Sequence, residues 1–217
     1  INHVPVRIYM CHGLRYQGCT GFKRKLLMAM EWISCHCATQ VMTVSKGVRD
    51  VLLADGISKK NPIIVWNGSV SGINIDKFDP TKEYQQDLLR GRWGLTKDHF
   101  VLTFVGRIVK DKGVNELVDA FVKLSKKYPN MRLLLIGRKE DLGNPISNDT
   151  QNEIKNNPAI ISTGPQYNVP DFLAITNLFV FPSYREGFGL SLMEAGAMGV
   201  PAISTDIIGC NEVIEEG

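Results

Sequence analysis

The sequence predicts an α/β fold built on parallel β-sheets, and three observations support this prediction. Short apolar runs typical of buried strands recur from residue 5 to residue 205. Helical patterns of about ten to fifteen residues separate most of them, which is the spacing of βαβ units. Several apolar runs end directly at a glycine, as strands do where loops gather at the carboxyl edge of a parallel sheet.

The composition is that of an ordinary globular protein. Of the 217 residues, 44% are apolar and 22% are charged, and the length fits one complete domain plus part of another. No run approaches roughly eighteen apolar residues and no basic-then-apolar leader is present, so neither a spanning helix nor a signal peptide is expected. The chain begins at Ile1 instead of Met, which indicates a processed or excised piece.

The charge pattern leaves one alternative open. The net charge of +3 is too small to indicate nucleic-acid binding. Arg15, Lys23, Arg24 and Lys25 gather near the start, either as a solvated helix face or as a basic rim that meets an anionic membrane or lipid-phosphate acceptor. The expected location is therefore the cytoplasm, with peripheral contact at the inner face of the membrane as the second interpretation of the basic cluster.

The cysteines argue against a disulfide framework. Five is an odd number, and the sequence has no Cys-x-x-Cys pair, which favours a reducing compartment such as the cytoplasm. Cys35-His36-Cys37 supplies too few ligands at the usual spacing for a zinc site, so no metal is expected.

Three strands and two helices are predicted before residue 70. The strands cover residues 5–11, 40–44 and 63–66, and the helices cover residues 22–37 and 46–54. Leu26, Leu27, Met30 and Ile33 recur at three-and-four spacing and predict one buried face for the first helix. Ser45 is the expected N-cap of the second helix.

Turn-forming residues then interrupt this pattern. Asn67-Gly68-Ser69 and Gly72 place a hinge near residues 67–75. Beyond the hinge, helices are predicted at 82–93, 114–127, 149–156 and 190–198, and strands at 100–105, 131–136, 159–163, 179–182 and 201–205. These units would present their loops at one edge of a parallel sheet, where ligands bind in such folds.

The segment from Pro182 to Glu194 is the richest in candidate site residues. Gly187 and Gly189 let the backbone approach an anion closely, and the helix that follows offers free amides and its positive dipole end. Glu194 lies about one turn into that helix, where its carboxylate would accept two ribose hydroxyl hydrogen bonds. Glu186 precedes the loop and would face a sugar.

Two cations follow an earlier predicted strand. Gly106-Arg107 ends that strand, Lys112-Gly113 precedes the next helix, and both side chains would converge on a diphosphate. Many sugar-nucleotide transferases use a divalent ion held by an Asp-x-Asp pair, which this sequence lacks. The cations and a helix terminus would take the place of the metal.

These residues resemble the metal-independent retaining glycosyltransferases of the GT-B fold, family four, also described as group-one transferases. The resemblance rests on Val105-Gly106-Arg107, Lys112-Gly113, Gly137, Gly164, Phe181-Pro182-Ser183, Glu186 with Glu194, and Gly199-Val200-Pro201. It extends from about residue 5 to the end of the chain and includes His12-Gly13 and Asn67-Gly68.

The resemblance implies two Rossmann-like domains, each a parallel sheet flanked by helices. Residues 1–70 would be the C-terminal part of an N-terminal, acceptor-side domain, which is expected to be partial. Residues 71–217 would be a nearly complete nucleotide-sugar donor-binding domain that lacks its last helix. The chain is therefore expected to be truncated at both ends.

The resemblance also implies site roles. Arg107 and Lys112 would hold the donor diphosphate, Glu194 would bind the ribose, and residues Gln166 to Val169 would contact the base. The whole predicted donor-binding set is Gly106, Arg107, Lys112, Gly137, Gln166, Val169, Gly187, Phe188, Gly189, Leu190 and Glu194. Phe188, Gly189 and Leu190 would act through their backbone amides. The predicted catalytic residues are Glu186, beside the transferred sugar, and His12, from the first domain.

The expected function is transfer of a sugar, with retention, from a nucleoside diphosphate sugar to an acceptor hydroxyl. A UDP-sugar is the favoured donor, a glycan or lipid-linked sugar the acceptor, and capsular, exo- or lipopolysaccharide biosynthesis the setting. The enzyme would be of the hexosyltransferase type, with no cofactor, because the nucleotide-sugar is a substrate. The alternative is a nucleotide-sugar-binding module without turnover. A dinucleotide-dependent oxidoreductase is disfavoured, because no Gly-x-Gly-x-x-Gly turn follows the first strand.

Overall fold

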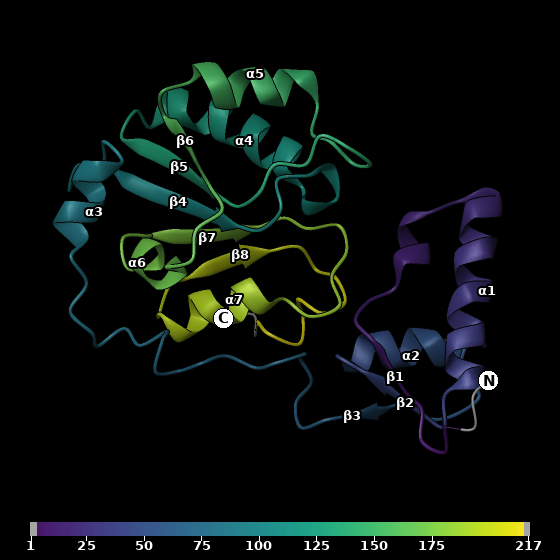
Figure 1. Cartoon of the computed structure of the whole chain (residues 1–217). Helices are drawn as coiled ribbons and strands as arrows, with labels where there is room; N and C mark the ends of the chain where they lie inside the picture. Colours follow the sequence, from purple (N-terminus) through teal and green to yellow (C-terminus); the bar gives the residue numbers. More distant parts are fainter. Residues whose placement is uncertain (1–3, 215–217) are drawn as a thin grey trace. The chain divides into compact units, whose positions relative to one another are not determined.

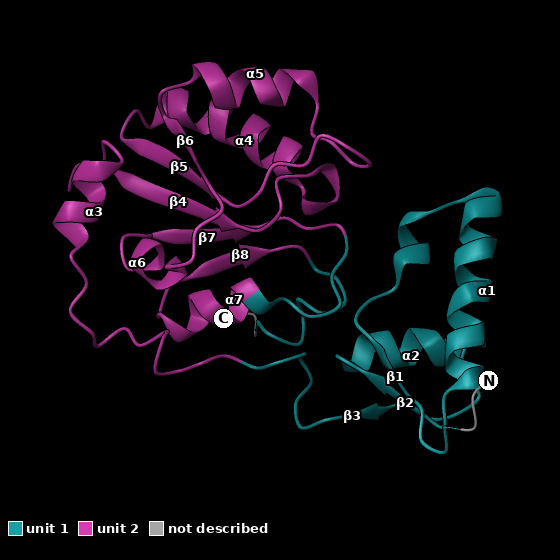
Figure 2. Ribbon diagram, in the orientation of Figure 1, with its two compact units in different colours: residues 1–72, 185–190, 206–217 teal, residues 73–184, 191–205 magenta. Residues whose placement is uncertain are grey.

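The chain forms two compact units in the computed structural model, which describes residues 4–214. The first unit comprises Ile1–Gly72, Arg185–Leu190 and Asp206–Gly217, and the second comprises Ile73–Tyr184 and Ser191–Thr205 (Figure 2). Two late segments of the chain thus group with its beginning. The domain boundary predicted at residue 70 remains a prediction, because compact units are defined by contacts and domains by independent folding.

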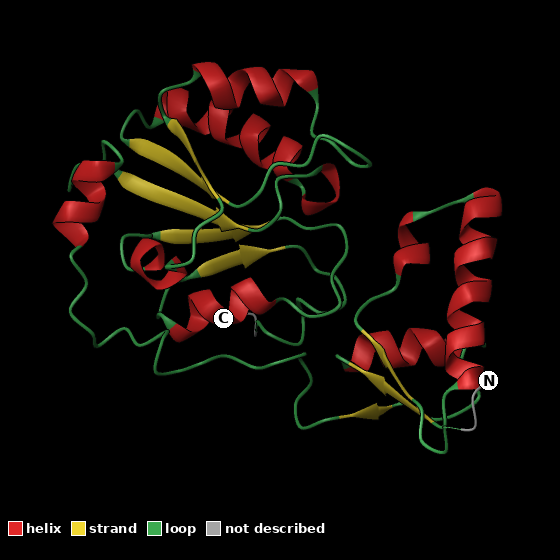
Figure 3. Cartoon of the chain, in the orientation of Figure 1, coloured by secondary structure: helices red, strands yellow, loops and turns green. Residues whose placement is uncertain are grey.

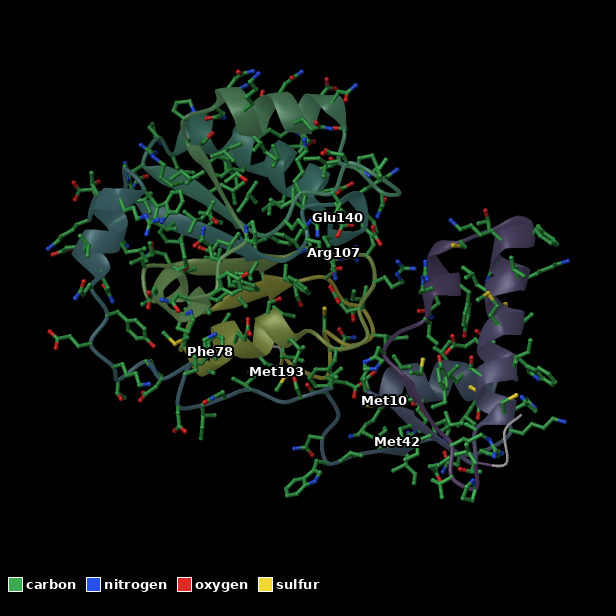
Figure 4. The ribbon with its side chains drawn as sticks, viewed as in Figure 1. Met10, Met42, Phe78, Arg107, Glu140 and Met193 are labelled. Atoms are coloured by element: carbon green, nitrogen blue, oxygen red, sulfur yellow. The ribbon has the colours of Figure 1, made fainter. Side chains whose placement is uncertain are left out.

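The first unit is built on a three-stranded parallel sheet in the order β1-β2-β3. Its elements are β1 (Ile8–Cys11), the 3-10 helix η1 (Arg15–Gly18), α1 (Gly21–Cys37), β2 (Gln40–Thr43), α2 (Lys46–Ala54) and β3 (Ile63–Ile64). Met10 of β1 pairs with Met42 of β2, and both side chains are labelled in Figure 4. The predicted strands are present but shorter than expected, since β1 begins at Ile8 and β3 ends at Ile64.

Helix α2 has the cap that the sequence predicts. The Ser45 hydroxyl accepts a hydrogen bond from the Val48 amide at 3.2 Å. Ser45 is fully buried, so this bond satisfies both the hydroxyl oxygen and one of the amides that a helix leaves unpaired at its N-terminus.

Helix α1 buries a different stripe from the one predicted. Leu26, Met30 and Ile33 are 50%, 57% and 54% exposed, so the prediction was wrong for these three residues, whereas Leu27 packs against the core. The packed stripe runs through Leu27, Glu31 and Cys35, of which Cys35 is buried and the other two are half-buried. The Glu31 carboxylate accepts hydrogen bonds from Tyr9 Oη at 2.5 Å and Cys11 Sγ at 3.2 Å. A periodicity search that counts only apolar residues passes over such a stripe.

None of the five cysteines, which all lie within residues 4–214, forms a disulfide. Cys11, Cys35 and Cys210 are buried. Burial, followed by the neighbouring Glu31 carboxylate, raises the pKa of the Cys11 thiol to about 12 and that of Cys35 to about 11. Both thiols therefore remain protonated at neutral pH and behave as small core residues.

The second unit is a five-stranded parallel sheet in the order β6-β5-β4-β7-β8 (Figure 1). The strands are β4 (Phe100–Val105), β5 (Met131–Ile136), β6 (Ile160–Gly164), β7 (Leu178–Phe181) and β8 (Ala202–Ser204). The helices are α3 (Gln86–Arg92), η2 (Lys110–Lys112), α4 (Val114–Lys127), α5 (Asn148–Asn156), α6 (Val169–Leu173) and α7 (Leu190–Ala197), whose first residue groups with the first unit. The strand order reverses between β4 and β7, which makes their carboxyl ends the topological switch point of a doubly wound sheet.

Helices cover both faces of this sheet, with α4 and α5 on one side and α6 and α7 on the other (Figure 3). Val101, Leu134 and Ile136 pack on the face that meets Phe172 of α6. Helix α4 buries four apolar residues, Val114, Leu117, Val118 and Phe121. Alternate strand residues thus serve two cores, so the central strands are apolar along their whole length.

Two local predictions differ from the structure in this unit. The predicted helix 82–93 begins only at Gln86, because Asp79 forms a turn in which its side chain accepts hydrogen bonds from Thr81 and its carbonyl accepts one from Tyr84 Oη. The short helix α6 was not predicted. Pro170 sits in its first turn, where proline is compatible with a helix start.

No helix within residues 4–214 has the length and apolar character needed to cross a membrane.

Candidate functional site

The predicted site residues divide between the two compact units. The second unit holds Gly106, Arg107, Lys112, Gly137, Gln166, Val169 and Glu194. The first unit holds His12, Glu186, Gly187, Phe188, Gly189 and Leu190.

Glycines form a closely packed backbone at the carboxyl edge of the second unit's sheet. A Cβ on Gly137 would lie only 1.8 Å from the Gly106 carbonyl oxygen, and the φ angle of Gly137 is +149°. The Gly137 amide donates to the Gly164 carbonyl at 3.0 Å. The backbones at the ends of β4, β5 and β6 therefore approach one another closely, and only a glycine at position 137 permits this approach.

Arg107 lies two residues after the end of β4 and forms an ion pair at this edge. Its guanidinium lies 3.1 Å from the Glu140 carboxylate, which comes from the loop after β5 (Figure 4). The Arg107 side chain is 54% exposed, so the pair contributes little to stability. The contact leaves the guanidinium at the sheet edge with its charge accessible to an anion.

Lys112 is positioned beside the end of β7. Its ammonium lies 5.7 Å from the centroid of the Phe181 ring, within the range of a cation–π contact. Gly113 makes this approach possible, since its φ is +69° and a Cβ there would lie 2.0 Å from the Pro182 carbonyl oxygen. Arg107 after β4 and Lys112 beside β7 thus place two cations at the switch point of the sheet.

The predicted base-contact segment lies between β6 and α6. Gln166 is half-buried, and its Nε2 donates to the Thr163 carbonyl at 2.9 Å. Val169 is the first residue of α6. Between them, Tyr167 is 93% exposed, and its carbonyl accepts a hydrogen bond from Lys77 Nζ at 3.1 Å.

Glu194 lies in α7, one turn from the helix start at Leu190. Burial raises the pKa of its carboxyl group, and the Lys77 ammonium opposes that rise. A half-buried carboxylate with a nearby cation is suited to accept hydrogen bonds from neutral hydroxyls, because the ligand then completes its solvation.

His12 and the glycine loop lie together in the first unit. A Cβ on Gly187 would sit 1.8 Å from the His12 carbonyl oxygen. Arg185 Nη1 donates to the Arg15 carbonyl at 2.8 Å, so the contact continues along the segment after β1. The two predicted catalytic residues, His12 and Glu186, therefore border one backbone contact that only a glycine at position 187 permits.

The amides of the glycine loop are partly engaged within the chain. The Gly189 amide donates to the Gly209 carbonyl at 2.9 Å, and the Leu190 amide donates to the Phe188 carbonyl at 2.9 Å. An anion that used these two amides would have to displace both bonds. Their predicted role toward sugar or phosphate stays a prediction.

Comparison with known proteins identifies the family. The model of glycosyl transferases group 1 matches residues 85–217. The chain belongs to this family. Similar to it is CapM of Staphylococcus aureus, a capsular polysaccharide biosynthesis glycosyltransferase, with 35% identity over the whole of this chain and 56% of CapM. The UDP-Gal:alpha-D-GlcNAc-diphosphoundecaprenol alpha-1,3-galactosyltransferase of Escherichia coli is 24% identical, over 98% of this chain and 54% of its own length.

Solved structures show the same fold for this member of group 1. HepE of Anabaena, crystallised with UDP and glucose, superposes with a TM-score of 0.76 at 18% identity, over 97% of this chain and 55% of HepE. The GT-B fold expected from the motif residues is thereby confirmed. The chain spans about half the length of the curated relatives it matches.

Sequence reasoning missed the contacts of three charged residues. Glu140 pairs with Arg107, Lys77 donates to the Tyr167 carbonyl and acts electrostatically on Glu194, and Glu212 accepts hydrogen bonds from the Lys46 and Gly47 amides at 2.8 Å each. Each contact joins segments distant in sequence, and no spacing rule along the chain predicts such a pairing. The one general rule that favours the Glu212 contact at the start of α2 is that carboxylates are stabilised at helix N-termini.

Proposed function

We propose that this protein transfers a sugar from a nucleoside diphosphate sugar, with UDP-sugar as the donor, to an acceptor hydroxyl with retention at the anomeric carbon. The observation that carries the proposal is the placement of Arg107 and Lys112 at the switch point between β4 and β7. Membership of the glycosyl transferases group 1 supports the same chemistry.

Departure of the diphosphate is the step that most needs stabilisation, because negative charge develops on the leaving oxygen. Arg107 and Lys112 would bind this group and meet the developing charge with fixed positive charge. Glu140 holds the Arg107 guanidinium at 3.1 Å before a donor arrives, and the diphosphate would then share or replace that carboxylate. The cations would make a divalent ion unnecessary.

The nucleoside would be bound by neighbouring groups of the second unit. Glu194 would accept hydrogen bonds from the ribose hydroxyls, which favours the ionised form of its half-buried carboxyl group. The segment Gln166 to Val169 would lie along the base, where the exposed main chain between β6 and α6 offers polar groups.

The sugar and acceptor would be handled by residues of the first unit. Glu186 would position the transferred sugar near its anomeric carbon, and His12 would contribute from the end of β1. The close approach of Gly187 to the His12 carbonyl supports this pairing of roles, because a shift of the loop backbone would displace the backbone at His12.

The acceptor is proposed to be a glycan or lipid-linked sugar in cell-surface polysaccharide assembly. CapM is named for capsular polysaccharide biosynthesis, and the Escherichia coli relative is named for a sugar carried on diphosphoundecaprenol. Both names describe those proteins, and they make an undecaprenol-linked acceptor the first one to test.

Calorimetric titration with UDP, GDP and ADP in the presence of a chelator tests the donor site. UDP is expected to bind, and Arg107→Ala and Glu194→Ala are each expected to weaken its binding by about tenfold or more, as for loss of one charge-assisted hydrogen bond. Lys123→Ala and Glu153→Ala are matched controls, since Lys123 forms an exposed ion pair with Asp119 and Glu153 is exposed on α5.

The outcomes separate three functions. UDP binding that both site variants weaken, together with sugar transfer, supports the glycosyltransferase. UDP binding without transfer to any acceptor identifies a nucleotide-sugar-binding module. Absence of nucleotide binding in folded protein, or equal effects of the control variants, contradicts the donor-site assignment.

A further inference from the structure

Lys77 lies in an ordered turn that follows the boundary between the two units. Its amide donates to Asn74 Oδ1 and to the Asn74 carbonyl, both at 3.0 Å. The next residue, Phe78, is only 7% exposed and anchors the turn in the second unit. The backbone at Lys77 is therefore held from both sides, which limits where its side chain can reach.

The Lys77 side chain extends to two segments of the predicted donor site. Its ammonium donates to the Tyr167 carbonyl at 3.1 Å and lies 5.5 Å from the Phe78 ring centroid. The same ammonium acts on Glu194 of α7, because it is the charge that lowers the pKa of that carboxyl group against the effect of burial. The Lys77 ammonium thus interacts with two segments besides its own turn: it donates a hydrogen bond to the base-contact segment and acts electrostatically on helix α7.

We propose that Lys77 is a positioning residue of the donor site: it holds the main chain of the base-contact segment at Tyr167 and supplies a positive charge that acts on the ribose-binding carboxylate of Glu194. The proposal rests on the proposed function, because it needs those two segments to bind a nucleoside. Lys77 itself would act through them and would touch no reacting atom.

The surroundings argue against a purely structural role. Tyr167 is 93% exposed, so the hydrogen bond to its carbonyl does not complete a packed core. An exposed lysine–carbonyl bond alone contributes little to stability. A positive charge beside a half-buried carboxylate matters more, because solvent screens it less.

A second titratable group, Tyr84, lies near the end of α7 and is neutral. Tyr84 Oη donates to Met198 Sδ at 3.6 Å beyond the end of the helix, and burial raises the pKa of Tyr84 above its ordinary value. Tyr84 therefore stays uncharged across the neutral range. Lys77 is the charged group through which the pKa of Glu194 responds to its neighbours.

The sign of the pH dependence follows from these contacts. Ribose binding needs the ionised carboxylate, so affinity falls as the pH drops through the pKa of Glu194. Removing the Lys77 charge leaves burial unopposed and raises the pKa of that carboxyl group further. The loss of UDP affinity on acidification should therefore begin at higher pH in Lys77→Met than in the unaltered protein.

Titration of the protein with UDP between about pH 5 and about pH 8 tests the proposal. Lys77→Met is expected to bind roughly tenfold more weakly at the acidic end of this range, with the difference narrowing as the pH rises. Lys77→Arg should restore most of the affinity, because it keeps the charge and a donor. Lys82→Met is the control, since Lys82 follows Lys77 closely in the chain and likewise donates to a backbone carbonyl, that of Asp76.

Equal affinities of Lys77→Met and the unaltered protein at every pH would overturn the proposal. A loss that is constant with pH and not restored by Lys77→Arg would overturn it too, because only a structural contact behaves so. If the unaltered protein fails to bind UDP, the proposed function fails. If Glu194→Ala weakens UDP binding and Lys77→Met does not, the proposal for Lys77 is wrong and the proposed function stands.

Discussion

Gly187 should tolerate no side chain, although its backbone conformation is open to other residues. A Cβ at this position would lie 1.8 Å from the His12 carbonyl oxygen and 3.2 Å from Val44 Cγ2, whereas real Cβ contacts are essentially never closer than 3.0 Å. The close atom belongs to the backbone, so it cannot rotate away. Gly187→Ala must therefore separate the loop from the end of β1 by more than an ångström.

The expected cost follows from this overlap. Overpacking a filled site by one methyl group costs about 1–3 kcal/mol, and a backbone–backbone clash belongs at the upper end, about 3 kcal/mol. For a chain of this length that corresponds to a fall in Tm of about 6–12 °C. The matched control is Gly196→Ala in α7, where a Cβ would meet nothing within 4 Å. That variant should be neutral or stabilised by up to about 1 kcal/mol.

Thermal unfolding combined with hydrogen exchange is the assay, because it reports both the size and the place of the change. In Gly187→Ala the amide of Gly189, which donates to the Gly209 carbonyl, should exchange faster, while amides of the sheet β4 and β5 should not. If Gly187→Ala is as stable as Gly196→Ala and the Gly189 amide stays protected, the loop does not pack against the His12 carbonyl as described.

Two further variants probe contacts that the sequence did not reveal. Glu212→Ala should lower the stability of the first unit by about 1–2 kcal/mol, because the Lys46 and Gly47 amides lose their acceptor; thermal unfolding beside Glu153→Ala checks this, and equal Tm values would contradict it. Gly137→Ala should cost about 3 kcal/mol and weaken UDP binding, because a Cβ would lie 1.8 Å from the Gly106 carbonyl beneath Arg107; calorimetry showing unchanged affinity would contradict it.

Much of the second unit's secondary structure could be predicted from the sequence. Strand β4 and helix α4 have the predicted bounds, because an apolar run of six residues and a strong three-and-four pattern each reflect one local conformation. The glycine at position 137 and the cation at 107 were also identified from sequence, since strand ends with glycine are local features. Their roles toward a donor remain proposals.

In the first unit, the face of helix α1 that packs on the core could not be predicted from the sequence. Helix α1 was predicted at nearly its true bounds, yet the stripe that packs on the core runs through the half-buried Glu31 and leaves Met30 exposed. Counting apolar residues fails here because the Glu31 carboxylate joins the packing through hydrogen bonds that Tyr9 and Cys11 donate from β1.

The class of fold, the elements with clear periodicity, the Ser45 cap and the cations and carboxylates that could serve a sugar nucleotide were predictable from the amino-acid sequence. The strand order β6-β5-β4-β7-β8, and with it the placement of Arg107 and Lys112 at one switch point, became known from the folded structure. The same holds for the contacts of Glu140 with Arg107 and of Lys77 with Tyr167. Periodicity and capping depend on residues within a few positions of one another, whereas an ion pair or a strand order depends on which distant segments the folded chain brings into contact.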